Sequence, residues 1–178
     1  LMVLMTIGIV SSMLFQLSQG YTDLQPMVYL TRHLLDYGML FYVMAIFGVF
    51  VQTLVPNKFA GMGVLVLFVI SLFVLDPLGL EDPLYQLGAA PGAAYSDMTG
   101  WDYFAWIQSW YSVYWLFFCL LLFVGAHLVW RRGGMDSLRL RVRRAGANLT
   151  PGIATLGVVA LAGFLGAGSF IFYNTRIL

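Results

Sequence analysis

Residues 101–144 read WDYFAWIQSWYSVYWLFFCLLLFVGAHLVWRRGGMDSLRLRVRR, and this stretch decides the fold. From residue 105 to residue 130 it contains no Asp, Glu, Lys or Arg. About 20 consecutive apolar residues in a helix are enough to cross the hydrocarbon core of a membrane. The stretch therefore predicts a membrane-spanning helix.

The two ends of this helix give it a direction. Trp and Tyr collect at membrane–water interfaces because their rings are apolar at one end and form hydrogen bonds at the other. Such residues crowd the start of the run, at Trp101, Tyr103, Trp106, Trp110, Tyr111 and Tyr114. Six arginines follow its end, at Arg131, Arg132, Arg139, Arg141, Arg143 and Arg144. Because short loops rich in Lys and Arg stay in the cytoplasm, we expect the helix to run from outside to inside. The arginines are expected to set this orientation and to contact lipid headgroups.

The composition also points to a membrane protein. Of the 178 residues, 61% are hydrophobic and 10% are charged, whereas a soluble domain carries roughly 25% charged residues. The single cysteine, Cys119, excludes a disulfide framework within the chain. The first residues are apolar but have no basic segment before them, so they are not a signal peptide. They look like a span whose beginning is missing, and we expect the 178 residues to belong to a longer polypeptide.

Four further apolar segments predict additional spans, separated by short polar connections with turn residues. The last of them begins at Thr150 and Pro151, a good N-cap followed by a residue suited to the first helical turn. The predicted fold is an all-α integral membrane bundle of about five transmembrane helices, forming one domain over residues 1–178. The five predicted spans are residues 1–17, 33–55, 59–75, 105–130 and 151–173.

The connections between these spans give a consistent topology. Lys58 and the block of six arginines fall on the inside, and the longest connection, residues 76–104, falls on the outside. This extracytoplasmic loop contains five acidic residues and no Lys or Arg. Residue 1 is then expected near the cytoplasm and Leu178 outside.

Small and polar residues on the spans suggest how the helices meet. Lipid provides no hydrophobic drive for helix association, so interfaces in membranes favour small side chains. The predicted helix-packing residues are Gly38, Ala45, Ala160, Gly163 and Ala167. A polar path through the bundle is predicted along Gln52, Gln108 and Ser112, with plain helix packing as the alternative interpretation.

The sequence carries no recognisable catalytic or metal-binding motif. It has no G-x-x-x-x-G-K-[ST] loop for phosphates, no H-E-x-x-H motif and no pair of cysteines. His33 and His127 are expected near opposite faces of a hydrocarbon core ~30 Å thick, so they cannot hold one haem between them. We therefore predict that the chain is not an enzyme and binds no cofactor, metal or nucleic acid.

Two local patterns leave alternatives open. Arg32 and Asp36 are four residues apart near the outer end of the second span, and they form either an interfacial ion pair or a gate or substrate contact. Residues 138–144, LRLRVRR, alternate apolar and basic residues. Period two is typical of a strand, but a short interfacial helix with Arg facing lipid phosphates also fits.

Five short segments carry a resemblance to a known family. They are RHLLDYG at 32–38, VPNK at 55–58, LGLEDPLYQLG at 78–88, PGAAYSDMTG at 91–100 and FIFYNTRIL at 170–178. The best markers among them are Tyr95-Ser96-Asp97-Met98 and Phe172-Tyr173-Asn174-Thr175. These segments resemble the last membrane spans of large bacterial proteins in which an ABC-exporter-type permease region is fused to a zinc aminopeptidase. The likeness covers roughly residues 30–178 and ends before the peptidase.

The resemblance implies a permease or membrane-anchor role in the bacterial inner membrane, with an ABC ATPase as partner. The family's peptidase would begin beyond residue 178, so no catalytic or zinc-binding residue carries over to this chain. An alternative is a non-catalytic structural transmembrane subunit of a larger energy-converting or photosynthetic complex. A redox enzyme with its own cofactor is a weaker third hypothesis, because it needs paired axial ligands or thiolates. In each case the expected partners are the lipid bilayer and other transmembrane helices or subunits.

Overall fold

The structure, a computed structural model, describes residues 2–24, 26–30, 38–55, 57–75, 78–79, 82–92, 102–130 and 137–176. These residues form helices and connections, with no strand among them, which confirms the predicted all-α fold for the part of the chain described. The elements are α1 (Met2–Ser18), α2 (Pro26–Val28), α3 (Gly38–Leu54), α4 (Lys58–Leu75), α5 (Asp102–Leu128), α6 (Leu138–Arg144), the 3-10 helix η3 (Ala145–Asn148) and α7 (Pro151–Arg176).

Two of these helices are long and apolar enough to cross a membrane, over Ala105–Leu128 in α5 and Pro151–Arg176 in α7. Length and composition alone support this statement. The helices α1, α3 and α4 are also apolar but shorter, with 17, 17 and 18 residues. At 1.5 Å per residue they extend roughly 26 Å, slightly less than a hydrocarbon core about 30 Å thick.

The starts of α4 and α7 follow ordinary capping chemistry. The first backbone N–H groups of a helix have no partner within the helix, so a side chain ahead of them stabilises the end. Asn57 Oδ1 accepts a hydrogen bond from the Phe59 N–H at 2.9 Å. Thr150 Oγ1 lies 3.5 Å from the Ile153 nitrogen, which donates to it. Thr150 therefore caps α7 as the sequence predicted, with Pro151 as its first residue.

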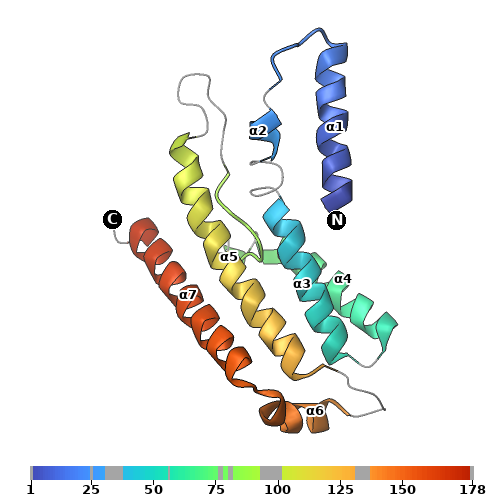
Figure 1. The fold of residues 1–178 in the computed structure, drawn as a ribbon, viewed down its shortest axis with the longest axis vertical. Helices are drawn as coiled ribbons and strands as arrows, with labels where there is room; N and C mark the ends of the chain where they lie inside the picture. Colours follow the sequence, from blue (N-terminus) through green and yellow to red (C-terminus); the bar gives the residue numbers. More distant parts are fainter. Residues whose placement is uncertain are drawn as a thin grey trace.

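The bundle is built around α5, with α7 along one side and α3 along the other (Figure 1). In Figure 1, α3 and α5 run in the same direction, and α7 runs back against α5. The helix α4 follows α3 after a short turn and packs against it. The short helices α6 and η3 lie across the end of the bundle at which α5 finishes and α7 begins (Figure 1).

The first helix touches the bundle near one of its ends. The Tyr42 hydroxyl donates to Met2 Sδ at 3.2 Å. The Met5 methyl lies 2.9 Å from the position that a Cβ on Gly38 would occupy. These contacts join the start of α1 to the start of α3. From there α1 extends away from the bundle and does not lie along α3 (Figure 1).

The core lies where α3, α5, α7 and the segment 82–92 meet. One cluster of buried side chains contains Val43, Leu87, Tyr111, Trp115, Cys119 and Ile171. Val43 on α3 is completely buried. Aromatic rings join α5 to α7: Trp110 packs on Phe170 with ring centroids 4.3 Å apart, and Tyr114 stacks on Phe164 at 4.5 Å.

The outward faces of α4 and α7 are apolar. On α4, after Lys58, there is no charged residue, and the exposed side chains include Phe59, Leu67 and Phe73, each at least two-thirds exposed. On α7, Val158, Val159 and Leu165 are more than half exposed. Contiguous apolar surface of this kind marks contact with a membrane or with a partner protein.

Candidate functional site

An irregular segment, residues 82–92, is packed between α3 and the middle of α5. The Trp115 indole Nε1 donates to the carbonyl oxygen of Ala89 at 2.7 Å. Leu87 is buried in the core cluster, and a Cβ on Gly88 would lie 2.9 Å from Leu40 Cα on α3. Since Trp115 follows Asp102 by thirteen residues of helix, this contact lies ~20 Å along α5 from its start. Residues 82–92 therefore reach deep into the bundle.

Three further features hold this segment in place. Asp82 Oδ1 accepts from the Leu84 N–H at 2.9 Å, which closes a local turn. Asp82 Oδ2 forms an ion pair with Arg176 Nη2 of α7 at 2.8 Å. Gly88 has a φ of +75°, a conformation that residues with a Cβ rarely adopt, and it also lies too close to α3 for a side chain. The segment is thus tied to α3, α5 and α7.

Beside this segment is a cavity of about 350 Å³, which we call the outer cavity. Its polar side chains are Gln108 and Ser112, one helical turn apart on α5, so the structure brings these two predicted residues together. No charged side chain is among its described lining residues. They are Met39, Leu40, Gly88, Ala89, Ala90, Pro91, Gly92, Gln108, Ser112 and Trp115. The cavity can therefore take an uncharged group with some hydrogen-bonding capacity.

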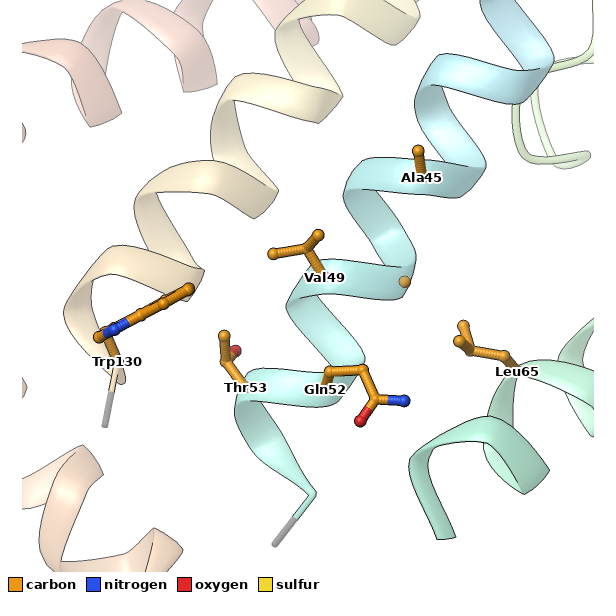
Figure 2. A pocket seen from close by; sticks show the side chains of 7 residues that line it. Ala45, Val49, Gln52, Thr53, Leu65 and Trp130 are labelled. Carbon is orange, nitrogen blue, oxygen red and sulfur yellow. The ribbon is translucent and has the colours of Figure 1, made fainter. Parts of the chain in front are cut away.

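The third residue of the predicted polar path, Gln52, lies elsewhere. It lines a surface groove of about 590 Å³, which we call the inner groove (Figure 2). Gln52 Nε2 donates to the Lys58 carbonyl oxygen at 3.4 Å, and Gln52 Oε1 lies 2.7 Å from where a Cβ on Gly61 would be. Gln52 therefore bridges the turn from α3 to α4. The residues that line the groove are Ala45, Gly48, Val49, Gln52, Thr53, Leu65 and Trp130.

Arg141 is buried at the same end of the bundle and joins three helices. Its guanidinium donates to the carbonyl oxygens of Thr53 and Leu54, at the end of α3, and to that of Val129, just after α5. The last carbonyl groups of a helix have no partner within the helix and carry partial negative charge. Arg141 satisfies three of them at once, and only 5% of the residue is exposed. Arg141 is therefore not available for contact with lipid headgroups, which is the role that the sequence predicted for it.

The other arginines of the basic block behave differently. Residues 138–144 form the helix α6, so the strand interpretation of LRLRVRR is wrong. In a helix, residues two positions apart point in nearly opposite directions. Arg139 and Arg143 accordingly lie on the side away from Arg141 and are exposed, as is Arg144. Arg131 and Arg132 lie outside the described residues.

The residues predicted to pack between helices have different surroundings. Ala160 and Ala167 on α7 are buried. A Cβ on Gly163 would lie 2.5 Å from the Phe117 ring of α5, so α7 approaches α5 closely here. Gly38 is buried next to Met5 of α1. Ala45 is exposed and lines the inner groove.

Among the described residues, no three His, Cys, Asp or Glu side chains lie close enough together to hold a metal ion. His127 is partly buried on α5. Cys119 is a buried free thiol. Arg32, His33 and Asp36, the other residues considered from the sequence, fall outside the described ranges.

Two features of the site were missed by sequence reasoning. One is the infolding of residues 82–92, to which the φ of Gly88 and the Trp115 indole contribute. The other is the cap formed by Arg141, because its neighbouring arginines gave no reason to assign this residue a separate role. The helical alternative for residues 138–144, which the sequence left open, places Arg141 on a different face from Arg139 and Arg143.

No protein-family model, curated protein or solved structure matches this chain. The functional assignment therefore rests on the residues and their geometry.

Proposed function

We propose that the chain is a multi-pass segment of the permease part of an ABC-type exporter in the bacterial inner membrane. Its membrane location is supported by the apolar outward faces of α4 and α7 and by the length of α5 and α7. The permease role is supported by one observation above all, the packing of residues 82–92 into the bundle against Trp115.

The physical argument concerns the backbone of that segment. Within a bilayer, N–H and C=O groups outside regular helices are tolerated only where protein buries them or where they line a cavity. Residues 82–92 meet both conditions, since Leu87 is buried and Gly88 to Gly92 line the outer cavity. Non-helical backbone at the depth of the hydrocarbon core is typical of transport proteins. A helical anchor that only fixes a domain to the membrane does not need it.

The two ends of the bundle support one orientation. The arginines of α6 lie at one end, where α3 and α5 finish. The Asp82–Arg176 ion pair lies at the other, where α7 finishes. Lys and Arg in short loops favour the cytoplasm, so α6 is inside, and the segment 82–92 and the end of α7 are outside.

We propose that α1, α3, α4, α5 and α7 all cross the membrane. For α3 and α4 this is supported by their packing in the bundle. For α1 it rests on composition, because α1 extends away from the bundle in Figure 1.

The outer cavity is then the proposed binding site for an uncharged part of the transported molecule, which Gln108 and Ser112 would contact. Energy would come from a separate ATPase, since the chain has no phosphate-binding loop.

A second candidate is a structural subunit of a larger membrane complex. It is favoured by the extent of exposed apolar surface on α4 and α7, which neighbouring helices of other subunits could cover as well as lipid. In that case the outer cavity would be a packing defect filled by a partner or by lipid.

Purification of the native complex in mild detergent separates the two. The permease proposal expects an ATPase to co-purify, and expects ATP hydrolysis that falls in a Gln108→Leu, Ser112→Ala variant. The matched control is Ser109→Ala, because Ser109 is exposed and bonds to its own helix at the Trp106 carbonyl. A stable complex that contains no ATPase, and that absorbs light through chlorophyll or haem, would replace the permease with the structural subunit.

A further inference from the structure

The inner groove is apolar along most of its length and polar at one end. Ala45, Gly48 and Val49 of α3 and Leu65 of α4 form the apolar part. Gln52 and Thr53 lie one turn further along α3, and the Trp130 side chain stands on the other flank (Figure 2). From Ala45 to Gln52 the helix rises ~10 Å. The groove thus resembles a slot for a short stretch of an amphipathic molecule.

The polar end of the groove lies where the chain is most positively charged. Thr53 and Leu54 accept hydrogen bonds from Arg141, so the guanidinium of this α6 residue lies at the same end. Lys58 is exposed and lies after the short turn that follows α3. The carbonyl oxygen of Lys58 accepts a hydrogen bond from the Gln52 side-chain amide. The described residues of the two connections at this end include no acidic residue and five basic ones, Lys58, Arg139, Arg141, Arg143 and Arg144. This charge favours an anion at the mouth of the groove.

The chemistry of the groove indicates its occupant. An apolar floor of Ala45, Gly48 and Val49 that leads to a basic end matches a molecule with an acyl chain and an anionic headgroup. Trp130 is about half exposed beside it, as expected for an indole at the level of the headgroups.

We propose that the inner groove is a binding site for an anionic phospholipid. An acyl chain lies over Ala45, Gly48 and Val49, and the phosphate faces Lys58 and the basic end of the bundle. Basic sites between helices on the cytoplasmic side are suited to acidic lipid headgroups. The inference rests on the membrane location proposed above and adds a defined site and a lipid class to it.

The test uses the full chain in nanodiscs of phosphatidylcholine that contain one-fifth brominated lipid. The brominated lipid is either phosphatidylglycerol or phosphatidylcholine, and bromine on the acyl chain quenches indole fluorescence on contact. The contribution of Trp130 is obtained by subtracting the spectrum of Trp130→Phe. We expect brominated phosphatidylglycerol to quench Trp130 several-fold more strongly than brominated phosphatidylcholine. Lys58→Gln should weaken this preference about fivefold, the usual effect of one basic residue near a membrane surface.

Two variants fill the groove and should abolish the preference. Gly48→Leu places a side chain next to Leu65, and Ala45→Phe acts at an exposed position that should not disturb folding. The matched control is Gly63→Leu on α4, where an added Cβ meets nothing within 4 Å. Its preference should equal that of the parent.

Each other outcome overturns the proposal in a distinct way. Equal quenching by the two lipids would show ordinary surrounding lipid. Quenching that survives Gly48→Leu and Ala45→Phe would place the lipid elsewhere, and protection of Trp130 from both lipids would show that a protein helix covers the groove. If alkaline carbonate released the chain from membranes, the membrane location itself would fail. A chain that stays inserted but shows no preference would disprove the lipid site alone.

Discussion

Gly163 is a residue at which α5 and α7 leave no room for a side chain. A Cβ there would lie 2.5 Å from the Phe117 ring, so even Ala requires that ring to move. We expect Gly163→Leu to lower the free energy of unfolding by roughly 1–3 kcal/mol through overpacking, and Gly163→Ala to have a smaller effect. Thermal unfolding in detergent measures both. The control is Gly166→Leu on the same helix, where an added Cβ meets nothing within 4 Å. Equal stability of the two Leu variants would contradict the close contact.

A second prediction for a single residue concerns Arg141. Arg141→Ala removes the partner of three helix-end carbonyl groups, two of α3 and one just beyond α5. A buried polar group left without a partner costs about 1–3 kcal/mol, so the bundle should be clearly less stable. Lys should restore little, because an ammonium lacks the planar fork that reaches all three oxygens.

Arg139→Ala is the matched control for Arg141, since it removes the same charge from the exposed side of the same helix. Its effect on the unfolding temperature should be small. If Arg139→Ala and Arg141→Ala destabilised the protein equally, the loss would come from charge or lipid contact and not from the cap.

At the scale of elements, the segment 82–92 depends on Trp115. Trp115→Phe removes the hydrogen bond to the Ala89 carbonyl, worth about 1 kcal/mol, and should let the segment open more often. Hydrogen exchange of the segment's amides should accelerate about fivefold, while exchange in the middle of α7 stays unchanged. Trp106→Phe is the control, because the Trp106 ring is 62% exposed on the same helix. Unchanged exchange in Trp115→Phe would mean that Leu87 and the Asp82–Arg176 pair alone hold the segment.

The five long helices could be predicted because each has local signals in its own sequence, whereas α2, α6 and η3 were not predicted in this way. Uninterrupted apolar residues mark α4 and α5, and Thr150 with Pro151 marks the start of α7 to the residue. Gln108 and Ser112 could be paired because four positions in a helix fix a shared face. Contacts between distant residues could not be predicted in this way. The Asp82–Arg176 pair joins positions 94 residues apart, and the hydrogen bond from Trp115 to Ala89 depends on a loop path that no periodicity encodes.

For the whole molecule, the central prediction is the side of the membrane on which each connection lies. The parent has one cysteine, Cys119, which is buried and should not react with a membrane-impermeant maleimide. Tyr85→Cys and Leu149→Cys place exposed thiols on the segment 82–92 and just before α7. The first should be labelled in intact cells, and the second only after the membrane is opened. Reporter fusions after Arg144 should agree with a cytoplasmic location.

The direction of the bundle should depend on the charge of the loop between α5 and α7. Replacing all six arginines of residues 131–144 with Gln would remove the Lys/Arg bias that sets orientation and would also remove the Arg141 cap. The separating variant therefore keeps Arg141 and replaces only the other five. If charge bias sets the topology, Leu149→Cys in this background should become partly accessible from outside while the helices remain folded. Labelling of Leu149→Cys from inside alone would show that the Arg141 cap and the packing of α5 against α7 are sufficient to fix the orientation.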